Sequence, residues 1–145
     1  MWSRLSNDDG SAALEFITVG MLLTVPLVYL VIVLAQLQAG ALAVEGAARN
    51  AARAVAMHGE QALAGAAVTT EFALRDAGVA GAEHRLVVDC GGDCAAPGGT
   101  VSVTVEALIP LPLVPAVLGL DSSLAIPIQA TALQPVSLHT VTDQP

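Results

Sequence analysis

The chain has 145 residues, of which 54% are apolar and only 3% aromatic, and its formal net charge is −8. This length allows one small domain. The acidic balance, with five scattered arginines and no lysine, argues against nucleic acid as a partner, because phosphate binding requires clustered basic side chains.

A membrane-spanning helix is predicted near the N-terminus. Residues 1–10 are polar, and no charged residue occurs from residue 16 to residue 44. Residues 16–37 are almost entirely apolar, and about 20 apolar residues suffice for a helix to cross the hydrocarbon core of a bilayer. We therefore expect residues 16–37 to be transmembrane, with a kink at Pro26 of the kind that membrane helices tolerate.

The helix is expected to continue beyond the membrane. Residues 38–56 are dominated by Ala, the best helix former, so the simplest prediction is one helix from residue 12 to about residue 58. Glu45, Arg49 and Arg53 recur every four residues and share one face of this helix. The opposite face carries small and apolar residues, namely Leu42, Ala43, Ala47, Ala51 and Ala54.

An α+β domain is predicted after this helix. A second, shorter helix is expected at residues 60–76, ending at Gly78. Three later segments alternate polar and apolar residues, the pattern of half-buried strands: residues 85–90, 99–106 and 124–132. Pro127 lacks the N–H that a central strand needs, which places its strand at an edge. The predicted fold is therefore a long helix, a second helix and a small antiparallel sheet of about three strands.

Residues 108–120 form a separate feature, because they are apolar, uncharged and interrupted by three prolines. Two interpretations remain open for this segment. It is either a loop folded over the back of the sheet or an exposed apolar patch that binds a partner subunit or the membrane surface.

Cys90 and Cys94 are the two cysteines of the chain, and they close a Gly-Gly-Asp loop. Such a pair favours a disulfide in an exported, oxidising location, and its alternatives are two free thiols or half of a metal site. No metal centre is predicted, because zinc needs further soft ligands and His84 and His139 are not spaced to provide them. The sheet domain is therefore expected outside the cell, although the count of basic residues alone weakly favours the opposite orientation.

The most informative stretch runs from Asp8 to Phe16. Gly10 ends the polar leader, and Glu15 comes five residues later, followed directly by an aromatic residue and the apolar segment. In these residues the chain resembles the type IV pilin superfamily, and most closely the TadE-like minor pseudopilins of tight-adherence (Flp-type) pili. The Ala/Arg run at residues 46–53 is similar to the segment that follows the membrane helix in this family.

The resemblance implies a structural subunit. A prepilin peptidase at the cytoplasmic face is expected to cut between Gly10 and Ser11, and the membrane and other pilin or pseudopilin subunits are the expected partners. Glu15 then lies about one helical turn from the new N-terminal ammonium, which is a natural counter-ion for an acid at the membrane-buried end of a helix. The resemblance implies that this pairing sets the register of subunits, with Phe16 as the aromatic neighbour of the acid. Because mature position one is Ser, N-terminal methylation is left open.

The predicted organisation has three parts. Residues 1–10 form a prepilin-type leader, residues 11–58 form the long helix that contains the span, and residues 59–145 form a small exterior α+β domain. The protein is expected in the cytoplasmic membrane with a single span, where it initiates or supports a pilus or a related secretion apparatus. Whether it stays in the membrane or enters the filament is left open.

Two other export routes are weighed against this prediction. A secretory signal would be cut at a small-x-small site, Ala39-Gly40-Ala41 or Ala41-Leu42-Ala43, but the apolar run is longer than the roughly 7–15 residues of such signals. A signal-anchored or secreted binding module would share the exterior location and would need no cleavage at Gly10.

Enzyme activity is not expected, and neither are a cofactor or a small-molecule substrate. The three histidines have no nucleophile or carboxylate constellation around them. The acidic pairs suit a solvated surface in an acidic chain, and these pairs are Glu71 with Asp76 and Asp89 with Asp93.

Overall fold

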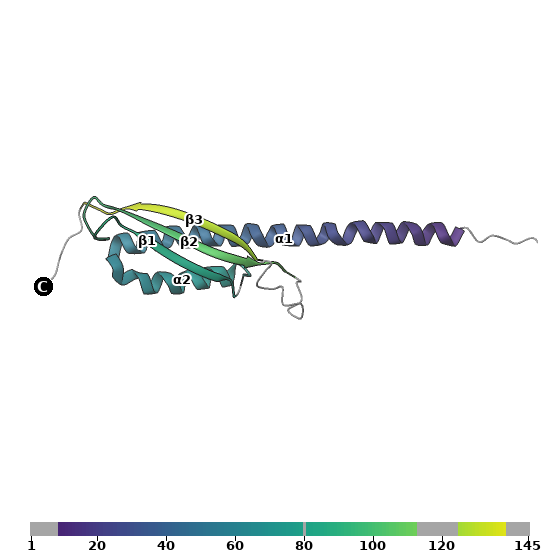
Figure 1. Cartoon of the computed structure of the whole chain (residues 1–145), viewed down its shortest axis with the longest axis horizontal. Helices are drawn as coiled ribbons and strands as arrows, with labels where there is room; N and C mark the ends of the chain where they lie inside the picture. The colour runs from purple at the N-terminus through teal and green to yellow at the C-terminus, as the bar shows by residue number, and fades with distance from the viewer. Residues whose placement is uncertain (1–8, 80, 113–124, 139–145) are drawn as a thin grey trace, which may run out of the picture. The chain divides into compact units, whose positions relative to one another are not determined.

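The computed structural model of the chain describes residues 9–79, 81–112 and 125–138 (Figure 1). The chain divides into two compact units, Met1–Leu34 and Ala35–Pro145. The elements follow the order α1, η1, α2, β1, β2 and β3. The predicted fold class is confirmed, because a long N-terminal helix precedes a shorter helix and a three-stranded antiparallel sheet.

The long helix α1 comprises Asp9–His58 and continues through Pro26. Its bounds agree with the helix predicted from residue 12 to about residue 58. Residues 9–34 of α1 belong to the first unit and residues 35–58 to the second. The unit boundary therefore lies within the predicted membrane span, so that Gln36 and Leu37 belong to the second unit.

A tight corner joins α1 to the second helix. Gly59 is buried and has a φ of 65°, a conformation that favours glycine because it has no Cβ. A single 3-10 turn, η1 (Gly59–Ala62), follows, and α2 (Leu63–Asp76) then completes the predicted second helix. Gly78, with a φ of 78°, ends α2 and donates its N–H to the carbonyl oxygen of Arg75 at 3.0 Å, so the predicted end of this helix is confirmed.

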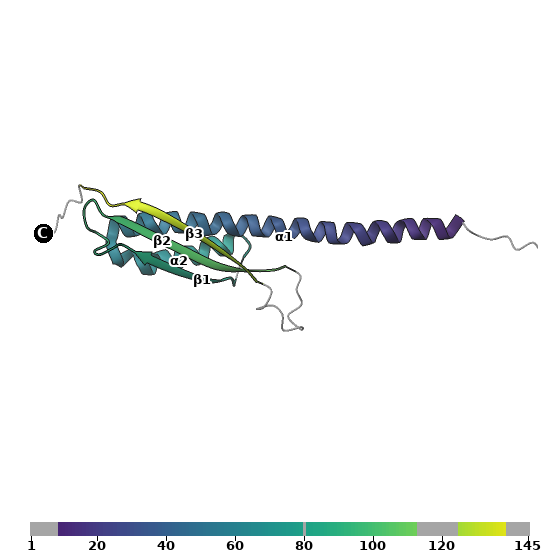
Figure 2. The ribbon, with the colours of Figure 1, turned by 45° about the horizontal axis from the view of Figure 1, so that its top comes forward.

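The sheet is a meander of β1 (Glu83–Asp89), β2 (Thr100–Pro110) and β3 (Ala125–Pro135), with β2 in the centre. Each strand pairs antiparallel with its neighbour. Figure 2 shows the sheet covering one side of α2 and of the C-terminal half of α1. The position of β3 at an edge agrees with the presence of Pro127 within it.

The central strand is longer than predicted. Residues 108–110 continue β2, although the sequence places them at the start of an apolar loop. Their alternation explains the difference, since Ile109 is only 1% exposed and extends the row of buried odd-numbered residues. Pro110 is tolerated at the last position of the strand because no ladder bond is lost there. Most of the remaining segment, residues 113–120, lies outside the described residues, as does Leu124 of the third predicted strand.

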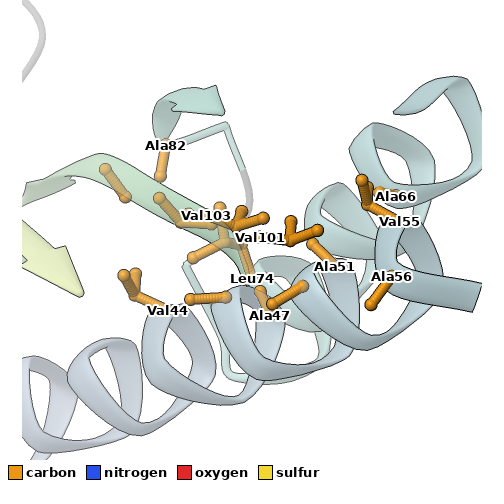
Figure 3. Packing of buried hydrophobic residues seen from close by; sticks show 14 of the residues in the cluster. Val44, Ala47, Ala51, Val55, Ala56, Ala66, Leu74, Ala82, Val101 and Val103 are labelled. Carbon is orange, nitrogen blue, oxygen red and sulfur yellow. The ribbon is translucent and has the colours of Figure 1, made fainter. Parts of the chain in front are cut away.

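The core lies between the sheet and the two helices (Figure 3). The central strand supplies Val101, Val103, Val105, Ala107 and Ile109, all of them buried. Residues of α1 and α2, most of them alanines, pack against these side chains, so the helices lie close to the sheet. They are Val44, Ala47, Ala48, Ala51, Ala52, Val55 and Ala56 of α1 and Ala66, Thr70 and Leu74 of α2.

The buried face of α1 overlaps in part with the small and apolar residues that lie opposite Glu45 and the arginines. Ala47 and Ala51 are buried, but Leu42 is 69% exposed, and Val44 and Val55 are completely buried. The sheet thus contacts α1 on a face that is rotated away from the direction opposite the charged residues.

Candidate functional site

The first candidate site is the N-terminal part of α1. Within the described residues, one helical stretch is long and apolar enough to cross a membrane, and it lies near the N-terminus. Its large apolar side chains from Leu14 to Leu34 are mostly exposed, and Phe16 is 81% exposed. A water-exposed apolar surface of this length is unfavourable, so the surface requires an apolar environment or a partner.

The predicted cleavage bond lies at the beginning of this helix. Because α1 begins at Asp9, the bond between Gly10 and Ser11 is in its first turn. Ser11 and Glu15 are four residues apart in the same helix, which places them on one face, about 6 Å apart along the axis. Residues 1–8, the rest of the predicted leader, lie outside the described residues.

Glu15 is the only acid on α1 between residue 12 and residue 44. It is exposed, and it forms no ion pair with any other residue that the structure describes. The nearby hydroxyl of Thr18 is satisfied within the helix, since its Oγ1 donates to the carbonyl oxygen of Leu14 at 2.8 Å. Glu15 is thus the one charged group at the N-terminal end of an otherwise apolar surface.

The second candidate feature is the loop between β1 and β2. Cys90 and Cys94 form a disulfide there. Cys94 is buried as part of the core, and the adjacent Ala95 lies beside Gly59 at the corner between the helices. The disulfide therefore closes the loop that follows β1, and Ala95 of the same loop packs against that corner.

Two acids stabilise the backbone of this loop, Asp89 at the end of β1 and Asp93 within the loop. Asp89 Oδ1 accepts the N–H of Gly91 at 3.0 Å, and Asp93 Oδ1 accepts the N–H of Ala95 at 2.9 Å. These bonds are local turns of a kind common in Asp-containing loops. Among the described residues, no group of three or more His, Cys, Asp or Glu side chains is arranged to hold a metal ion.

The remaining acids and histidines named from the sequence lie apart on the surface. Glu71 and Asp76 are exposed on α2. His58 ends α1, and the ring Nδ1 of His84 lies 3.4 Å from the carbonyl oxygen of Ala82. His139 lies outside the described residues.

Sequence reasoning missed one polar contact of α1. The side chain of Gln36 donates from Nε2 to the carbonyl oxygen of Pro110 at 3.3 Å, which joins α1 to the end of β2. The sequence did contain a signal for this contact, because Gln36 is a polar residue near the end of the predicted membrane span. In a search for membrane spans, such a residue counts only as an interruption of the apolar run. The contact shows that α1 is already part of the second unit at this residue.

Comparison of the chain with protein-family models, with characterised proteins and with solved structures found no match.

Proposed function

We propose that this protein is a membrane-anchored structural subunit of the pilin type, cut by a prepilin peptidase between Gly10 and Ser11. More specifically, we propose that it is a TadE-like minor pseudopilin, which supports assembly of a tight-adherence pilus or a related secretion apparatus. It acts by packing its helix against other pilin-like subunits and performs no catalysis.

The observation that carries the proposal is the position of Glu15. Residues 16–34 contain no charge and rise about 28 Å as a helix, close to the roughly 30 Å of a bilayer's hydrocarbon core. Glu15 therefore lies at the end of the span, where a buried charge costs less than the approximately 3 kcal/mol found at the centre. A carboxylate at this position requires a counter-ion. Cleavage after Gly10 creates one, namely the new N-terminal ammonium group of Ser11.

The continuity of α1 supports the same role. One helix contains both the apolar surface and the residues that pack under the sheet. A subunit that associates through its membrane helix thereby carries a folded domain with it. The disulfide between Cys90 and Cys94 supports an exterior location for that domain, because such bonds persist in oxidising compartments.

The experiment that tests this role replaces Glu15 by the isosteric amide. Glu15→Gln should leave membrane insertion and cleavage intact, and it should abolish recovery of the chain with other pilin subunits and the pili on the cell surface. Glu60→Gln is the matched control, because Glu60 is an exposed glutamate of η1 that belongs to the second unit. Normal pili and normal subunit recovery in the Glu15→Gln strain would rule out the counter-ion role.

A further inference from the structure

Two segments of the second unit meet α1 at Gly40. A Cβ atom added to Gly40 would lie 3.0 Å from Cδ1 of Ile109 in β2 and 3.8 Å from Cγ2 of Val79, just after α2. One helical turn towards the N-terminus, Gln36 donates from Nε2 to the carbonyl oxygen of Pro110 at 3.3 Å. The end of α2 and the end of β2 therefore lie beside the same part of α1.

The segments that form this end of the second unit carry no charge. Pro110 pairs with Ala125, so β3 begins at the same end. Charged residues begin at Asp76, the last residue of α2, and at Glu83, which pairs with Leu108, two residues before Pro110. We call the segments between these charges the uncharged end, and they are residues 77–79, 81–82, 107–112 and 125–127.

The uncharged end presents apolar side chains. Leu108, on the outer face of β2, is 40% exposed, and Ile126 of β3 is 36% exposed. Leu111 and Pro112, which follow β2, are half-buried. In the sequence, the run without charge continues as far as Leu120. Such a surface is unfavourable in water, so it favours surroundings that are less polar.

The position of Gln36 places the uncharged end near the membrane surface. Gln36 belongs both to the second unit and to the predicted span, residues 16–37. Because residues 16–34 rise about 28 Å, close to the thickness of the hydrocarbon core, this core ends near Leu34. Gln36 comes two residues later in α1, about 3 Å along the helix axis. The headgroup layer is about 5–7 Å thick, so Gln36 and the carbonyl group of Pro110 lie within it.

We propose that the uncharged end contacts the lipid headgroup layer, as a second contact of this chain with the bilayer besides the span. Leu108, Leu111 and Ile126 are the side chains that meet the lipid. The contact rests on the proposed function in one respect, namely that α1 spans a membrane. It requires neither cleavage after Gly10 nor a partner subunit.

Position and charge favour lipid over a protein as the occupant of this surface. Lipid surrounds a membrane helix at the level of Gln36, so a protein partner would first have to displace it. The uncharged end has no arginine, and Asp76 and Glu83 border it, so anionic headgroups are not attracted to it. The contact is therefore apolar, and it limits the tilt of the folded domain against the membrane plane.

Quenching by brominated lipids tests the contact in the full-length chain. A fluorescent amino acid at Leu111, in phosphatidylcholine vesicles, should lose more fluorescence to lipids brominated near the headgroup than to lipids brominated near the bilayer centre. The same amino acid at Leu133 is the matched control. Leu133 is 69% exposed, but it pairs with Ser102, which is eight residues, or about 27 Å, from Pro110 along β2. Equal quenching at Leu111 and Leu133 would overturn the proposal, as would no quenching at Leu111.

A probe in the span separates this contact from the proposed function. Leu27 is 61% exposed on α1, and a fluorescent amino acid there should be quenched most by lipids brominated near the bilayer centre. Quenching at Leu27 without quenching at Leu111 would count against the surface contact alone. No quenching at Leu27 would contradict the membrane anchor and the surface contact together. An uncut chain in cells that is quenched at both positions in vesicles would count against the proposed cleavage alone.

Salt and lipid charge test the apolar nature of the contact. Quenching at Leu111 should be equal in phosphatidylcholine vesicles and in vesicles that also contain phosphatidylglycerol. It should persist at about 1 M salt, where the Debye length is about 3 Å and electrostatic attraction is screened. It should also persist when the chain is diluted among the vesicles, because no second copy takes part. Loss of quenching at high salt or on dilution would contradict an apolar contact with lipid.

Discussion

Gly40 of α1 lies against the side chain of Ile109 of β2. A Cβ atom added to Gly40 would be 3.0 Å from Ile109 Cδ1 and 3.3 Å from its Cγ1. The absence of a side chain at residue 40 therefore allows the helix to lie close to Ile109, near the end of β2. The hydrogen bond from Gln36 to Pro110, one helical turn earlier, fixes the same contact.

Gly40→Val should destabilise the second unit. Ile109 is 1% exposed and Val adds two methyl groups beyond the Cβ, so the added side chain should lower the free energy of unfolding by about 1–3 kcal/mol. Urea unfolding of the detergent-solubilised chain, followed by protease resistance, measures this change. Gly46→Val is the control, because a Cβ at Gly46 has nothing within 4 Å. Equal losses in the two variants would show that helix propensity, and not the contact with Ile109, causes the effect.

Gln36→Ala should also weaken the junction between α1 and β2. Loss of the bond to the carbonyl oxygen of Pro110 should lower the unfolding free energy by about 1 kcal/mol. Gln38→Ala, at an exposed position on the same helix, should have no measurable effect in the same unfolding assay. The account of this junction fails if the two variants are equally stable.

Val103→Ala tests the position of the core. Val103 is completely buried at the centre of β2, whereas Val87 of β1 is 42% exposed on the other face of the sheet. Val103→Ala should lower the unfolding free energy by about 2 kcal/mol, through lost burial and the cavity that remains. Val87→Ala should change it by less than about half of that value, and a reversed order would contradict the described register.

Much of this fold is predictable because the physical signals are local. The alternation of Val101, Val103 and Val105 specifies a strand with one buried face, and the Ala-rich run of α1 specifies a helix. Gly78 marks the end of α2 through its positive φ. Each of these signals depends on the residue itself or on its nearest neighbours.

The parts that sequence reasoning missed depend on contacts between distant residues. Leu42 looks like a core residue, but it is exposed because the sheet covers a different face of α1. Pro110 looks like a strand breaker, yet β2 reaches it because no ladder bond is lost at the last position of the strand, where Pro110 pairs with Ala125 of β3. At the candidate site, the sequence predicts a helix from residue 12 that includes Glu15, whereas the structure begins it at Asp9, so that Gly10 and Ser11 lie within it. The cation that pairs with Glu15 depends on processing and on neighbouring subunits and stays a prediction.

The disulfide gives a prediction that concerns both stability and location. Closing the short loop between Cys90 and Cys94 should contribute about 2 kcal/mol to the unfolding free energy by the loop-entropy relation, so reductant should lower the stability by that amount. The double variant Cys90→Ala and Cys94→Ala should be insensitive to reductant. Alkylation of both thiols in the native, membrane-inserted chain before any reduction would contradict an oxidised, exterior domain.

The central claim is that the chain is a prepilin-type subunit, and the intact mass of the membrane-extracted protein tests it most directly. In cells that contain the prepilin peptidase, the mass should correspond to a chain that starts at Ser11, and deletion of the peptidase should restore the leader that ends at Gly10. A full-length chain in both strains would contradict the claim and indicate a signal-anchored protein. A chain that starts near Leu42 or Val44 would contradict it as well, because that start indicates a secretory signal.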